Sequence, residues 1–135
     1  MKHLKRLTVV LSAITISVLS LNSAAVGQRA EKFVNVGFDS DGDPFLLDRT
    51  SMQKSEPRFG HVLKIYQMKN DLMTEILVRS SCGDESLSIV ALRTYSQGVK
   101  LTEEKVHQQV QPRTTDNPAS LAMSYYCHAI DARGW

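Results

Sequence analysis

Residues 61–101 read HVLKIYQMKNDLMTEILVRSSCGDESLSIVALRTYSQGVKL, and this stretch decides the fold. It contains three runs with strong β-propensity, which are 61–69, 73–82 and 86–96. Each run is followed by a pair of turn-forming residues, and these pairs are Asn70-Asp71, Gly83-Asp84 and Gln97-Gly98. Connections this short join antiparallel neighbours, because parallel strands need crossovers of a dozen or more residues. The stretch therefore predicts an antiparallel meander.

The segments before this stretch predict two further strands. Residues 33–39 and 44–48 are short apolar runs on either side of the turn-rich segment 40–43, Ser-Asp-Gly-Asp. Asp-Gly is a favoured hairpin pair, so the two runs are expected to form the arms of a first hairpin. Residues 49–60 are polar and contain proline and glycine, and they are expected to form a loop.

The segments after the stretch predict a short strand piece and a final helix. Residues 99–101 continue the sheet, while the polar residues 102–117 leave two alternatives, a short helix or an edge strand near 106–110. Asp116-Asn117 provides a helix-cap candidate before a proline at the first helical position. The helix should bury the residues at helical spacing, namely Ala119, Met123, Cys127 and Ile130. The fold class is therefore α+β, a single antiparallel β-meander sheet with a C-terminal helix.

The first 27 residues have the pattern of a secretory signal peptide. Basic residues precede an uncharged, mostly apolar run from Leu7 to Leu21, and small residues follow it. The run is short for a membrane-spanning helix, so cleavage within 25–27 is expected, with no membrane span afterwards. Residues 28–135 would then form one soluble, extracytoplasmic domain with its core at about 33–128. Removing three basic residues takes the formal net charge from +2 to −1, which argues against a nucleic-acid partner.

Two cysteines, Cys82 and Cys127, lie 45 positions apart in the part expected to be secreted. Small extracytoplasmic domains commonly oxidise such a pair. Cys82 ends the apolar face of the 73–82 run, and Cys127 lies on the apolar face of the predicted helix. A disulfide that pins the helix across the sheet is therefore expected, and it would stabilise the fold by roughly 4 kcal/mol. The alternative is a reactive thiol with a histidine partner.

Several short segments occur in a distinctive order along the chain: FLLDRTSM at 45–52, LKIYQM at 63–68, SSCGD at 80–84, RTYSQG at 93–98 and NPASLAMSYYC at 117–127. This order resembles the surface-adhesin protein E-like domain, a small secreted bacterial module. The residues that carry the family pattern most clearly are Phe33, Asp48, Ser51, Tyr66 and Tyr95. The chain departs from the pattern at two of these positions, Phe33 and Tyr66, where the family often has tryptophan. It also has DNPAS at 116–120 in place of Pro-Gly-Ser.

The resemblance implies a sheet packed with a helix, closed by one disulfide, and a role in adhesion. We therefore expect a secreted or periplasmic, non-enzymatic module that binds an extracytoplasmic protein or matrix component and needs no cofactor. No contact residue can be carried over from the family. The alternatives are a small secreted hydrolase, an inhibitor of one, and an envelope structural protein without a discrete ligand.

Three acids, Asp39, Asp41 and Asp43, alternate with small residues after the first strand. A standard calcium loop starting at Asp39 needs glycine where Pro44 stands and a bidentate glutamate where Thr50 stands. The phosphatase nucleophile loop D-x-D-G needs a parallel sheet, which the short connections exclude. We therefore expect a hairpin connection with local side-chain-to-backbone hydrogen bonds, and no regular metal site. A weak calcium contact at these three acids is the alternative.

Overall fold

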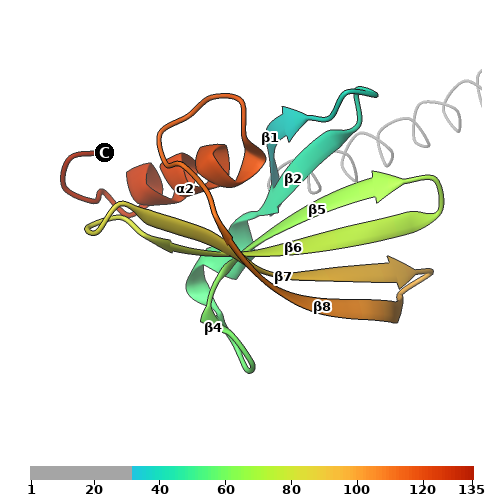
Figure 1. Ribbon diagram of the computed structural model, residues 1–135. Helices are drawn as coiled ribbons and strands as arrows, with labels where there is room; N and C mark the ends of the chain where they lie inside the picture. Colours follow the sequence, from blue (N-terminus) through green and yellow to red (C-terminus); the bar gives the residue numbers. More distant parts are fainter. Residues whose placement is uncertain (1–31) are drawn as a thin grey trace, which may run out of the picture. The chain divides into compact units, whose positions relative to one another are not determined.

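The strands of the main sheet follow one another in the order of the sequence. The structure, a computed structural model, describes residues 32–135, so the predicted signal peptide lies outside the described residues. The main sheet has six strands, all paired antiparallel, in the order β1-β2-β5-β6-β7-β8 (Figure 1). These strands are β1 (Phe33–Phe38), β2 (Pro44–Asp48), β5 (Leu63–Lys69), β6 (Leu72–Ser81), β7 (Ser86–Ser96) and β8 (Val99–Gln109). The predicted antiparallel meander is confirmed.

Tight turns set the pairing at one end of this sheet. Asn70, in the turn between β5 and β6, has a φ of 53°. Gln97 and Gly98 have φ values of 49° and 82°, the pattern of a type I′ turn, whose twist matches that of the flanking strands. Both turns lie with the 39–43 connection at the right-hand end in Figure 1. We call this the open end of the sheet.

The helix α2 (Pro118–Ala129) covers one face of the sheet, which we call the helix face (Figure 1). The helix begins as predicted, because the Asn117 side chain accepts a hydrogen bond from the Ala119 backbone N–H at 2.9 Å. The core of this face joins five strands to the helix and consists of Val36, Leu47, Leu63, Ile65, Val78, Leu87, Ala119, Ala122, Met123 and Cys127. The expectation for Ile130 is wrong, since the helix ends before it and its side chain is exposed. None of the helices among residues 32–135 has the length and apolarity needed to span a membrane.

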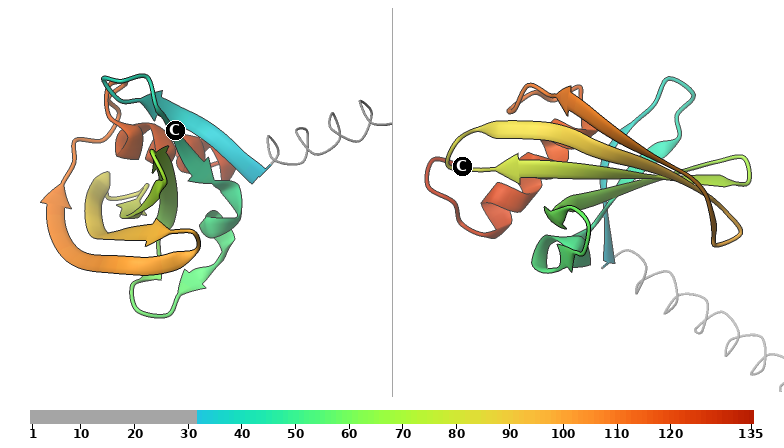
Figure 2. Two further views of the ribbon diagram at one scale, coloured as in Figure 1. Left: turned by 90° about the vertical axis from the view of Figure 1, so that its right-hand side faces the viewer. Right: turned by 60° about the horizontal axis from the view of Figure 1, so that its bottom comes forward.

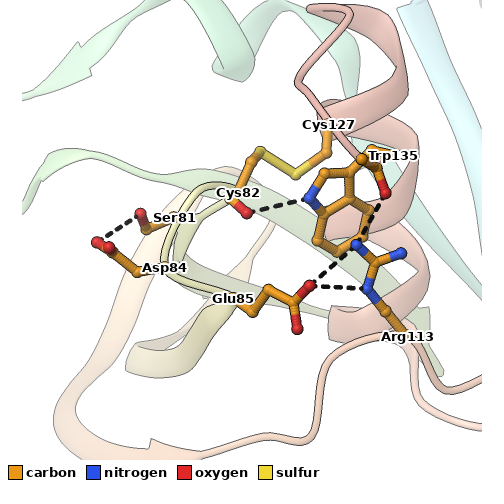
Figure 3. The surroundings of a disulfide bond; sticks show 8 residues. Ser81, Cys82, Asp84, Glu85, Arg113, Cys127 and Trp135 are labelled. Carbon is orange, nitrogen blue, oxygen red and sulfur yellow. Dashed lines mark hydrogen bonds and ion pairs between the residues drawn. A yellow bond between two sulfur atoms is a disulfide. The ribbon is translucent and has the colours of Figure 1, made fainter.

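A disulfide ties α2 to the turn between β6 and β7 (Figure 3). Cys82 and Cys127 are bonded, with their Cα atoms 5.8 Å apart, and Cys127 is fully buried. The Trp135 indole N–H donates to the Cys82 carbonyl oxygen at 3.0 Å, and the Arg113 guanidinium lies 3.9 Å from the centre of the indole ring. The predicted disulfide is confirmed. Since both cysteines of the chain are in the bond, the reactive-thiol alternative is wrong.

The segment predicted as a loop, 49–60, contains regular structure. It forms the 3₁₀-helix η1 (Arg49–Gln53) and then a small hairpin of β3 (Ser55–Glu56) and β4 (Gly60–His61). We call residues 54–61 the strap. Figure 1 shows this hairpin on the side of the sheet opposite α2, and we call that side the strap face. A second, smaller core lies there, in which Phe59 packs against Val62, Leu77, Val90 and Ala91.

The edge strand β8 is longer than predicted. It runs without a break from 99 to 109. Of the two alternatives for the polar segment, the edge strand is therefore confirmed, although it begins earlier than 106, and the short helix is wrong. Almost all of its side chains are exposed, and for that reason no apolar alternation marks it in the sequence. Two irregularities interrupt its pairing with β7, and such bulges protect a sheet edge from pairing with other chains. Figure 2 shows how strongly the whole sheet is twisted.

Candidate functional site

The strap face carries a cluster of buried charged side chains around Arg93 on β7. The Arg93 side chain is only 8% exposed. Its Nη1 donates to Glu75 at 3.0 Å, its Nη2 to Glu56 at 2.9 Å and its Nε to Glu103 at 2.6 Å. We call these four residues the Arg93 cluster. They come from β3, β6, β7 and β8, so the cluster joins the strap to three strands of the sheet.

Strand pairing aligns three members of the Arg93 cluster in one row with Tyr66. Tyr66, Glu75, Arg93 and Glu103 are successive cross-strand partners on β5, β6, β7 and β8. Cross-strand partners project from the same face of a sheet, so all four side chains reach the strap face. Glu56, the fourth member of the cluster, reaches Arg93 from the strap, which lies over this face of the sheet.

Two tyrosines donate hydrogen bonds to the Glu75 carboxylate. The Tyr66 hydroxyl lies 2.6 Å from one Glu75 oxygen, and the Tyr95 hydroxyl lies 3.4 Å from the other. Burial and the hydrogen bond to Glu75 raise the pKa of Tyr66, and burial and the negative charge of Glu75 raise the pKa of Tyr95. Both phenols are therefore neutral donors at pH 7. Neither is activated as a nucleophile or a general base.

The charges of the cluster are fixed by one another. Burial alone would raise the pKa of Glu56, but the hydrogen bonds from Arg93 and from two backbone N–H groups of the strap outweigh it and lower that pKa. The hydrogen bond from Arg93 lowers the pKa of Glu103. Burial works against the Arg93 charge, yet its three carboxylate partners raise the pKa of Arg93 overall. A network with every member satisfied is rigid and holds its neighbours in place.

Methionines continue the row of tyrosines toward the open end. Met68, Met73 and Tyr95 are successive cross-strand partners, one step along the strands from the Tyr66 row. Met68 is 56% exposed, and the side chains of Met73, Tyr66 and Tyr95 are partly exposed. We call these four residues the tyrosine–methionine surface. Tyrosine and methionine are enriched where proteins contact one another.

The structure gathers the residues that carry the family pattern. The Phe33 ring meets the Tyr66 ring edge-on, with centroids 6.2 Å apart, and Asp48 is the cross-strand partner of Phe33. Tyr66 and Tyr95 share one carboxylate partner, as described above. Ser51 supports them from η1, where its hydroxyl donates to the Asp48 carbonyl oxygen at 2.6 Å. Four of these five residues thus lie on the strap face, and the fifth, Ser51, forms a hydrogen bond with the backbone of Asp48.

The acids of the first hairpin form a separate group at the open end. Ligand oxygens of Asp39, Asp41 and Asp43 lie within 4.8 Å of one another. The Lys69 ammonium lies 3.0, 2.6 and 3.8 Å from carboxylate oxygens of these acids, and its hydrogen bond lowers the pKa of Asp39. Asp39 also accepts hydrogen bonds from the Asp41 and Asp43 backbone N–H groups. A calcium ion would therefore have to compete with the Lys69 ammonium, which already offsets one of the three negative charges.

Two pockets flank the first turn of α2 on the helix face. One, of about 290 Å³, is lined by Val36, Gly37, Phe38, Thr115, Asp116, Pro118 and Leu121. The other, of about 130 Å³, is lined by Phe45, Ile65, Ile76, Ile89, Asn117, Pro118 and Ala119. Neither lining contains a histidine or an acid of the 39–43 connection. Both lie below the usual size of about 300–1,000 Å³ for a small-molecule site, so neither carries a functional argument.

Sequence reasoning missed Glu56, Glu75, Arg93 and Glu103. One signal was available, because a two-residue turn at Asn70-Asp71 sets the register of β5 and β6 and puts Tyr66 opposite Glu75. The lengths of the next two turns do not predict that Arg93 and Glu103 lie opposite Glu75 and Arg93, respectively. A bulge in β7 and another in β8 shift each of them by one position, and bulges have no firm sequence signature.

Comparisons of the chain with protein-family models, with curated proteins and with solved structures find no match. The resemblance to the surface-adhesin protein E-like domain therefore stays a prediction.

Proposed function

We propose that the chain is an extracytoplasmic protein-binding module that contacts its partner through the tyrosine–methionine surface. The observation that supports this proposal is the exposed Met68 beside two tyrosines whose hydroxyl groups are held by Glu75. Tyrosines fixed in this way lose little conformational entropy on binding, which favours affinity. Methionine side chains adapt to the shape of a partner.

The charges on the strap face favour binding over catalysis. Glu75 accepts hydrogen bonds from Arg93 and from two tyrosines, so both of its carboxylate oxygens are already engaged within the protein. General acid–base catalysis requires a group that exchanges its proton near the working pH, whereas the pKa values of Glu56 and Glu103 are lowered and those of Tyr66 and Tyr95 are raised, all away from neutral pH. The disulfide supports an oxidising compartment, which agrees with a role outside the cytoplasm.

A pair of matched variants tests the proposal. Met68 and Leu72 belong to the same hairpin and are 56% and 43% exposed, but they project from opposite faces. Immobilised residues 28–135, as wild type, Met68→Glu and Leu72→Glu, are incubated with the extracytoplasmic fraction of the source organism. Captured proteins are then quantified by mass spectrometry.

We expect at least one protein to be captured in equal amounts by wild type and by Leu72→Glu. Met68→Glu should capture about tenfold less of that protein, which is the effect expected for a hot-spot residue. Equal thermal unfolding midpoints of the variants confirm that the fold is intact. If capture depends on Leu72 and not on Met68, or if no protein is enriched over the empty matrix, the proposed surface is wrong.

A further inference from the structure

Three charged side chains form hydrogen bonds or ion pairs that attach the strap to the sheet. Glu56 on the strap is paired with Arg93 at 2.9 Å, and Arg58 on the strap is paired with Glu103 on β8. The Arg79 guanidinium donates to the Phe59 carbonyl oxygen at 2.9 Å. Two of these three attachments therefore need an ionised carboxylate.

One carboxylate both shapes the strap and attaches it. One Glu56 oxygen accepts from the Arg58 and Phe59 backbone N–H groups, each at 2.9 Å, and so closes the turn of the small hairpin. The other oxygen accepts from Arg93. Protonation of Glu56 therefore weakens the turn and its attachment together, because a neutral carboxyl is a poorer acceptor for both.

The strap covers apolar surface. Leu77 and Ala91 are fully buried and Val90 is 6% exposed, and all three pack in the small core that Phe59 closes. The two strands of the strap are each two residues long and pair only with one another. Besides the charged attachments, two ring contacts hold the strap: the Arg93 guanidinium lies 5.5 Å from the centre of the Phe59 ring, and the ring of His61, at the end of the strap, lies 5.7 Å from that of Tyr126 on α2. Its position depends on the charged attachments more than on backbone pairing.

We propose that the strap is an acid-released cover: neutralising Glu56 and Glu103 detaches residues 54–61 from the sheet and uncovers the apolar surface formed by Leu77, Val90 and Ala91. The helix face, pinned by the disulfide, stays folded during this release.

The surrounding groups favour release at low pH. The charged and titratable neighbours of the cluster are Arg58 on the strap, Tyr66 on β5, Glu75 and Arg79 on β6, Tyr95 on β7 and Lys100 on β8. The lowered pKa values of Glu56 and Glu103 lie below their ordinary value of 4.5. The attachment is therefore complete above pH 4.5 and is lost as the pH falls through the lowered values. After neutralisation, Arg58, Arg93 and Lys100 would repel one another.

Hydrogen exchange of the wild-type protein tests the proposal without any substitution. Peptides from 54–61, from β5 and from α2 are followed by mass spectrometry between pH 7 and pH 3, with each rate corrected for the intrinsic pH dependence of exchange. We expect the strap peptide to lose protection by about 10- to 100-fold at a pH where β5 and α2 are still protected. The proposal is overturned if the strap keeps its protection to pH 3, or loses it together with β5 and α2.

A matched pair of variants provides the second test. Glu56→Gln removes one of the two carboxylate attachments and the acceptor that closes the strap turn, so its strap peptide should lose part of its protection at pH 7, in the same direction as the wild-type strap in acid. Glu104→Gln on β8 removes an exposed charge away from the strap and should leave exchange unchanged. Unchanged strap protection in a folded Glu56→Gln protein contradicts the proposal. If that variant does not fold, the wild-type pH series decides.

Discussion

Arg93 is the single residue on which the arrangement of the strap face depends most. It lies among three carboxylates, and its own side chain and that of Glu75 are only 8% and 6% exposed. Removing one partner of a buried charge network leaves the remaining charges buried without compensation. The resulting loss in the free energy of unfolding is larger than the loss expected if the whole network were replaced by apolar side chains. The organising role of Arg93 therefore predicts a large effect from a single substitution.

We expect Arg93→Met to lower the free energy of unfolding at pH 7 by about 3–5 kcal/mol, measured by urea denaturation. Lys105→Met on the exposed edge strand serves as the control, and it should change the same quantity by less than about 0.5 kcal/mol. A loss below about 1 kcal/mol for Arg93→Met would show that the cluster is not the organising element of this face.

Lys69 provides a second prediction at the scale of the residue. Its ammonium group lowers the pKa of Asp39, so the ionised form of Asp39 is favoured in the folded protein. This contribution to stability is present above the ordinary pKa of 3.8 and is lost as the pH falls through the lowered value. In a carboxyl-carbon NMR titration, the Asp39 midpoint should rise in Lys69→Met and stay unchanged in Lys105→Met. An equal midpoint in wild type and Lys69→Met would contradict the ion pairs.

At the scale of the element, the start of α2 depends on one side chain. The Asn117 side-chain oxygen satisfies the Ala119 N–H, which would otherwise lack a partner in the first turn. We expect Asn117→Ala to reduce the free energy of unfolding by about 1 kcal/mol, while Asn117→Ser, which keeps a cap acceptor, should retain most of the stability. Both values come from urea denaturation. Equal destabilisation by alanine and serine would show that the cap contributes nothing here.

The elements differ in how far the sequence determines them. Strands β5, β6 and β7 were predictable because their apolar residues alternate and their turns are short. Strand β8 carries almost no buried side chain, so its pairing is decided by the backbone of β7 and leaves no apolar pattern. The strap was missed for a different reason, since Glu56 finds its partner 37 positions away and no local pattern encodes such a pair.

At the scale of the whole molecule, the disulfide connects the sheet to α2, and these two parts together form the helix-face core. We expect reduction to lower the free energy of unfolding by roughly 4 kcal/mol, the value for a closed loop of 45 residues. Urea denaturation with and without a phosphine reductant measures this difference. The Cys82→Ser/Cys127→Ser double variant is the control, because the reductant should not affect it. An unchanged wild-type midpoint after complete reduction would contradict the stabilising role.

The two faces of the molecule also differ in how much of their role could be predicted. The helix face was expected from the spacing of residues such as Cys82 and Cys127. The strap face was not, because its tyrosines look like core residues in the sequence and only the pairing of strands brings them to Glu75. The candidate site thus emerges from the register of the sheet.

The most direct test of the proposed binding role is site-specific photo-crosslinking in the source organism. A benzophenone amino acid is placed at Met68 on the tyrosine–methionine surface or at Ile130 beyond α2, two exposed positions on different parts of the molecule. We predict that irradiation yields a discrete crosslinked protein from position 68 and none from position 130. Crosslinks from position 130 alone, or none from either position, would contradict the account.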